Sequence, residues 1–120
     1  MNHTVNTTWG QRVKVCNMFP TVGSLDEMRR SRIIRGLLVE NVDAQALSTN
    51  AITKNACGKW EIPEKNEERS CEITLGDAEL AMFAEFITVL SDKKQVPMIF
   101  VAFFSAIIEL YNENTTEEEK

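Results

Sequence analysis

The most hydrophobic stretch of the chain, residues 96–108 (VPMIFVAFFSAII), constrains its folding more than any other segment. Its thirteen residues are too few to cross a bilayer, which takes about 20 apolar residues. Lysines precede the run and Glu109 follows it. Pro97 suits the first turn of a helix, which we expect to continue to about Tyr111.

This last helix has little polar surface. Only Ser105, Glu109 and Asn112 form a polar stripe along it. A helix so apolar must be covered on nearly every side, either by its own fold or by a second copy of the chain. Its aromatic and apolar side chains are therefore expected in the core or in a homodimer interface, for which the candidates are Phe100, Phe103, Phe104 and Ile107.

Four further helices are predicted where apolar residues recur at helical spacing. They cover residues 8–19, 24–38, 41–48 and 77–90. The second has the clearest start, because Ser24 and Glu27 form a capping-box pattern, and the third has Asp43 near its start. In the first, Val13 and Val15 also alternate with polar residues, so a strand remains an alternative there.

Residues 59–62 and 70–75 alternate apolar with polar side chains and predict a β-hairpin with a polar connection. We therefore expect a helix-dominated α+β protein with about five helices and one hairpin, in an order of elements like that of a winged helix. The chain has 120 residues, of which 43% are hydrophobic and 26% charged, as in a single globular domain. We place this domain at residues 8–111, between a flexible N-terminus (1–7) and an acidic, disordered tail (112–120).

The sequence lacks the residue sets of common catalytic and metal sites. Its only histidine, His3, excludes a multi-histidine metal site and lies in a polar segment unsuited to a Ser-His or Cys-His pair. No glycine-rich phosphate loop is present. Cys16, Cys57 and Cys71 are odd in number and form no C-x-x-C pair, which favours free thiols. With no apolar signal segment at the N-terminus, we expect a cytoplasmic protein without enzyme activity, metal or cofactor.

The net charge of −5 is unevenly divided along the chain. Residues 1–60 carry +4 and residues 61–120 carry −9, an asymmetry that points to electrostatic contact with a partner. Candidate partner-binding residues come from the second helix and from the hairpin connection, and they are Arg29, Arg32, Arg35, Glu64, Glu67 and Glu68. The alternative is that these charges form ordinary solvated faces or satisfy each other.

A winged helix would bind DNA through basic residues, and the charges here argue against that. The predicted wing, residues 61–72, carries five glutamates against Lys65 and Arg69. Because phosphate neutralisation supplies most non-specific DNA affinity, this acidic segment disfavours nucleic acid as a partner.

Five elements follow one another along the chain: a short N-terminal helix, the turn FPTVGS, the helix that opens SLDEMRRSRIIRGLL, a polar hairpin that ends in EITLGDAEL, and an apolar C-terminal pair. In this order, over residues 9–110, the chain resembles small uncharacterised accessory proteins of bacteriophages and prophages. Phe19 stands where a leucine is usual. The resemblance implies a bacterial host cytoplasm and work done through binding.

Together these observations predict a protein-binding module. We expect it to be a phage-encoded modulator or inhibitor whose partner is a host or phage protein, with no contact to a membrane. Two alternatives stay open, which are a winged-helix DNA-binding regulator and a structural or assembly component of a virion.

Overall fold

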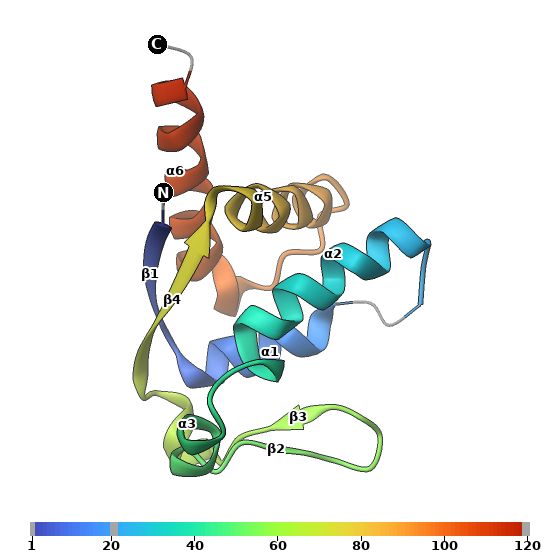
Figure 1. Ribbon diagram of the computed structural model, residues 1–120, viewed down its shortest axis with the longest axis vertical. Coiled ribbons are helices and arrows are strands. Elements are labelled where there is room, and N and C mark those ends of the chain that lie inside the picture. The colour runs from blue at the N-terminus through green and yellow to red at the C-terminus, as the bar shows by residue number, and fades with distance from the viewer. Residues whose placement is uncertain (1, 20–21, 119–120) are drawn as a thin grey trace. The chain divides into compact units, whose positions relative to one another are not determined.

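The protein is described by a computed structural model that covers residues 2–19 and 22–118 (Figure 1). Its fold is α+β and dominated by helices, as the sequence predicts. Within the described residues the elements follow in the order β1 (Asn2–Thr8), α1 (Trp9–Met18), α2 (Leu25–Arg35), the π-helical turn η1 (Gly36–Glu40), α3 (Ala44–Thr49), β2 (Thr53–Lys54), β3 (Trp60–Glu61), α4 (Glu64–Glu67), β4 (Ser70–Gly76), α5 (Asp77–Asp92), the 3-10 turn η2 (Met98–Phe100) and α6 (Val101–Glu118).

The described chain forms two compact units, where the composition predicted a single domain. The N-terminal unit consists of residues 6–73, and the C-terminal unit combines residues 2–5 with residues 74–118. Strands β1 and β4 pair with each other, and both run from one unit into the other. Because the boundary falls inside two strands, no linker-like segment marks it in the sequence.

Helices α1 and α2 begin where their caps predict. The Thr8 side chain accepts a hydrogen bond from the backbone amide of Gln11, and Ser24 Oγ accepts one from the amide of Glu27 at 3.1 Å. The strand alternative for the first segment is therefore wrong. The predicted turn between the two helices includes residues 20–21, which lie outside the described residues.

The N-terminal segment differs from the flexible region that its polar composition predicts. Residues 2–8 form strand β1, and the side chain of Val5 is buried. His3 Nε2 lies 2.7 Å from Oδ1 of Asp77, the first residue of α5. Three threonines and a valine give the segment the β-branched character of a strand, which outweighs its polarity once β4 is available for pairing.

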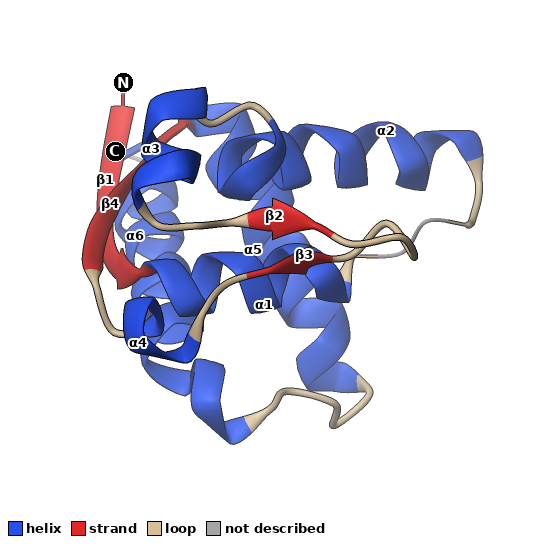
Figure 2. Cartoon of the chain, turned by 90° about the horizontal axis from the view of Figure 1, so that it is seen from below, coloured by secondary structure: helices blue, strands red, loops and turns tan. Residues whose placement is uncertain are grey.

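The predicted pairing of residues 59–62 with residues 70–75 is wrong. Strand β3 pairs with β2 in antiparallel register, with Thr53 opposite Glu61, whereas β4 pairs with β1 (Figure 2). The predicted polar connection is the short helix α4, which begins after Pro63. Asn17 supports β3 from outside the sheet, because its amide donates to the Trp60 carbonyl and accepts from the Trp60 amide, at 2.8 and 3.0 Å.

The C-terminal unit contains the two longest helices. Helix α5 forms at the predicted place and packs on α6. Pro97 precedes the 3-10 turn η2, which leads into α6. Helix α6 continues to Glu118, where we predicted a disordered tail, because no glycine or proline interrupts residues 101–118. The last two residues of that predicted tail lie outside the described residues.

Candidate binding surfaces

Two arginines of the N-terminal unit join α1 to the segment formed by α2 and η1, and we call them the arginine staples. Arg12 in α1 donates from Nε to the Leu38 carbonyl at 2.9 Å and from Nη2 to the Leu37 carbonyl at 3.0 Å. Its Nη1 donates to the Glu72 carbonyl at 3.3 Å, and its Cζ lies 4.2 Å from the ring centroid of Trp9. Carbonyls in the last turn of a helix lack partners within the helix, and Arg12 supplies donors to those of η1.

Arg35, a predicted partner-binding residue, is the second staple. Its Nη1 donates to the carbonyl of Cys16 at 2.8 Å, in the last turn of α1, and its Nε donates to Glu40 Oε1 at 2.8 Å. Only 11% of the Arg35 side chain is exposed. The prediction for this residue is therefore wrong, because its guanidinium faces the interior of the N-terminal unit.

The other two predicted arginines, Arg29 and Arg32, do lie on the exposed face of α2. Arg29 lies between Leu25 and Ile33 along one face, at a spacing of four residues from each, and Arg32 lies next to Arg29 at a spacing of three. Leu25 is 68% exposed and Ile33 is 40% exposed. Among the described residues, neither arginine forms an ion pair, whereas the neighbouring Arg30 pairs with Asp26 at 3.0 Å. We call these four residues, Leu25, Arg29, Arg32 and Ile33, the α2 stripe.

The three predicted acids lie on or beside α4 and do not act alike. Glu64 and Glu68 are exposed, but Glu67 is half-buried and pairs with Lys14 at 3.6 Å. Helix α4 is held in place by Asn66, which is buried and donates to the Asn50 carbonyl at 2.8 Å. The acidic candidate surface is thus reduced to two exposed glutamates.

The four candidates for a homodimer interface are buried within the C-terminal unit. Phe83 of α5 makes edge-on contacts with Phe103 and Phe104, whose ring centroids lie 5.8 and 6.2 Å away. The ring centroids of Phe100 and Phe104 lie 5.5 Å apart, and Ile107 is fully buried. Of the two predicted roles, the core is the one in which these side chains are found, and a part in a homodimer interface stays a prediction.

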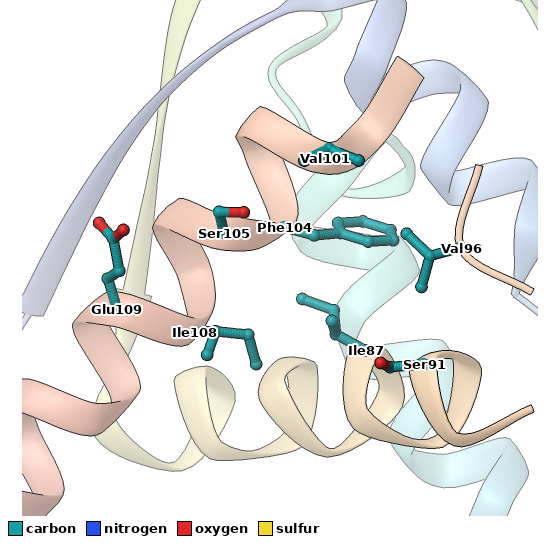
Figure 3. A pocket seen from close by; sticks show the side chains of 8 residues that line it. All are labelled: Ile87, Ser91, Val96, Val101, Phe104, Ser105, Ile108 and Glu109. Atoms are coloured by element: carbon teal, nitrogen blue, oxygen red, sulfur yellow. The ribbon is translucent and has the colours of Figure 1, made fainter. Parts of the chain in front are cut away.

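Helices α5 and α6 and the segment that joins them form an open groove on the C-terminal unit (Figure 3). Its volume is about 390 Å³. Five apolar side chains line it, and Ser91, Ser105 and Glu109 supply the polar atoms; the apolar residues are Ile87, Val96, Val101, Phe104 and Ile108. We call this feature the α5–α6 groove.

Apolar side chains beside the groove are also exposed. Met98 is 88% exposed and Ile99 is 59% exposed, and both precede Val101 at one end of the groove. Contiguous exposed apolar surface on a folded protein marks a binding site more often than an accident of folding. Sequence reasoning missed this surface because the whole segment 96–108 has the composition of a core.

The cysteines are free thiols, of which Cys16 is buried, Cys71 is half-buried and Cys57 is exposed. Burial raises the pKa of Cys16 to about 11, although the nearby charge of Arg35 opposes this rise. Burial also raises the pKa of Cys71 above its ordinary value, against a hydrogen bond from Arg12. Both groups stay protonated at neutral pH and are poor nucleophiles.

Residues 2–19 and 22–118 contain no cluster of three or more metal-ligating side chains, and none of their helices has the length and apolarity needed to span a membrane. Searches among protein families, curated proteins and solved structures find no match to the chain.

Proposed function

We propose that this chain is a non-enzymatic protein-binding module that acts in a host bacterial cytoplasm as a phage-encoded modulator or inhibitor. Its docking surface is the α2 stripe, and its partner presents an acidic surface with apolar side chains between the carboxylates. The resemblance to phage accessory proteins supports the setting, and the α2 stripe supports the mode of binding.

The observation that carries the proposal is the combination, on one helix face, of two exposed aliphatic side chains with two arginines that form no ion pair to any described residue. Arginine binds carboxylates through paired donors, and Leu25 and Ile33 add apolar contact area. Exposed arginines on a helix face are usually solvated, and single exposed aliphatic residues are common on protein surfaces. The support for binding comes from the two kinds of side chain lying side by side on one face of α2.

The test is capture from a bacterial host lysate by the immobilised chain. The double variant Arg29→Glu with Arg32→Glu should lose proteins that the wild type retains, because both contacts with carboxylates become repulsive. Lys59→Glu with Lys65→Glu is the matched control, since it changes two exposed lysines away from the stripe and alters the net charge by the same amount. If the double variant retains the same proteins as the control, the α2 stripe is not the docking surface.

A second candidate function is duplex DNA binding, and one observation favours it. The real hairpin, β2–β3, directly follows α3 and carries Lys54 and Lys59, whereas the segment first assigned to the wing is acidic. Lys54 is partly engaged, since its Nζ lies 3.9 Å from Glu40 and 5.6 Å from the Trp60 ring. A gel-shift assay at low salt decides this candidate, because absence of any shift with duplex DNA rejects it.

A further inference from the structure

The geometry points to head-to-tail self-association, in which the α2 stripe of one copy docks in the α5–α6 groove of a second copy. The inference uses the α2 stripe of the proposed function and adds the surface that receives it. The two surfaces match in length and in apolar character, and Glu109 of the groove is opposite in charge to Arg32 of the stripe.

The lengths of the two surfaces agree. The stripe extends from Leu25 to Ile33, and the α6 side of the groove extends from Val101 to Glu109. Each covers eight residue steps of helix, which is about 12 Å at 1.5 Å per residue. A groove of about 390 Å³ is as large as the pockets that take small ligands, so it has room for two aliphatic side chains.

The charges select one direction of docking. When α2 lies parallel to α6, Ile33 reaches the end of the groove at Glu109, and the neighbouring Arg32 faces that carboxylate. Residues 2–5 and 74–118 carry a net charge of −6, whereas residues 6–73 carry +1. Complementary charges of this kind steer association and fix the register of an interface.

The apolar surface around the groove favours a protein occupant over a small molecule. In the same parallel alignment Leu25 reaches the Val101 end, and Val22, which is 86% exposed, extends toward Met98 and Ile99. A ligand that fills the groove alone would leave Met98 and Ile99 in water. A helix with an apolar residue before its first turn covers them.

Because the stripe and the groove are different patches, each copy retains one unused surface after a contact forms. Such an interface produces rings or open chains rather than closed two-fold dimers. This is the behaviour expected of the alternative function in virion assembly. The contact is small, so the association should be weak and should depend on protein concentration.

The experiment measures molar mass by light scattering over a dilution series from about 1 mM to about 10 µM, the range of a weak interface. The wild type should rise above 13.6 kDa at the high end. Arg32→Glu alone and Glu109→Lys alone should each stay at the mass of one chain, since each places like charges in contact. An equimolar mixture of the two should associate again, because Glu at 32 then meets Lys at 109 in the other chain.

Matched controls have the same net charges as the two variants. Lys65→Glu and Glu64→Lys on α4 change exposed residues outside both surfaces, and they should associate like the wild type. Arg32, Glu109 and Ser105 are also exposed, and circular dichroism checks that each variant folds. Ser105→Phe is a second groove variant, which fills the groove with a neutral side chain and should block association without forming an ion pair with Glu109.

Two results would overturn the inference. One is a wild-type mass of 13.6 kDa at every concentration, and the other is an equimolar mixture that associates no more than its separate components. Neither result touches the proposed function, because capture from the lysate needs only the α2 stripe. Conversely, Glu109→Lys should keep that capture while losing self-association, which separates the two proposals.

Discussion

The two units of this chain are stabilised in different ways. The N-terminal unit joins its helices through arginines that donate to backbone carbonyls near helix ends, whereas the C-terminal unit packs aromatic rings between two long helices. Polar staples fix direction and distance between elements, because donors and acceptors must align. Aromatic packing instead depends on filling volume. Arginines on neighbouring turns of one helix can therefore have different roles. Arg35 of α2 joins two helices, whereas Arg32 is exposed and available for binding.

The largest expected effect comes from the aromatic core of the C-terminal unit. Phe83→Ala should lower the free energy of unfolding by about 3–5 kcal/mol, because it leaves a cavity against Phe103 and Phe104. Urea denaturation followed by circular dichroism measures the loss. Val89→Ala on the same helix is the control, since Val89 is exposed and should cost far less. Equal losses for the two variants would contradict a core centred on Phe83.

Next in size is the loss of a staple in the N-terminal unit. Arg12→Met keeps an apolar stem but removes the donor to three carbonyls, of which that of Leu38 is in a buried hydrogen bond, and it should cost about 2–4 kcal/mol in the same denaturation assay. Arg12→Lys should cost less, since one ammonium group restores part of the hydrogen bonding. A stability unchanged in Arg12→Met would show that the staple contributes nothing net.

A smaller effect is expected where α1 passes closest to α4. A Cβ placed on Gly10 would lie 2.8 Å from Glu67 Cβ and 2.9 Å from the Glu67 carbonyl oxygen. Gly10→Ala should therefore destabilise the protein by about 1–3 kcal/mol, because backbone must shift. Gly23→Ala is the comparison, since its nearest neighbour is the flexible end of the Glu27 side chain. A melting temperature that drops more for Gly23→Ala would contradict the close packing at Gly10.

The smallest effect concerns the polar contact that holds β1 to α5. The hydrogen bond from His3 lowers the pKa of Asp77 below its ordinary value of 3.8. The stabilisation from a lowered carboxyl pKa is present above the unfolded-state value and is lost as pH falls through the folded-state value. Asp77→Asn should therefore be less stable than the wild type near neutral pH and approach it below pH of about 3.8 in acid titrations. A constant difference at all pH values would assign no role to this ionisation.

Local signals in the sequence predicted the helices well. Ser24 and Asp43 cap the helices that they were expected to begin, and the apolar face of residues 77–90 is the buried side of α5. Strand pairing was not predicted, because it depends on partners distant in the sequence. The alternation of residues 70–75 predicts a strand but does not say which strand it pairs with. No local feature favours β1 over residues 59–62 as that partner.

The candidate surfaces were predicted in part. Helical spacing placed Arg29, Arg32 and Arg35 together, but Arg35 lies at the C-terminal end of α2, within reach of the Cys16 carbonyl. Sequence spacing predicts which face of a helix a residue lies on, but it does not predict which backbone groups of other elements lie nearby. It therefore could not distinguish Arg35, a staple, from Arg29 and Arg32 of the stripe. Arg12 gave no signal at all, since a single arginine in a short helix is ordinary in sequence.

The pairing of β1 with β4 can form only late in synthesis on the ribosome, because the two strands lie far apart in the sequence. Asp77 follows His3 by 74 residues, so at about 5–20 residues per second the first strand waits roughly 4 to 15 seconds for its partner. During that interval residues 2–8 lack β4 as a partner, and their backbone donors and acceptors bind water. Asn2 and Asn6, which stay exposed in the final fold, keep the nascent strand polar while the ribosome completes its partner.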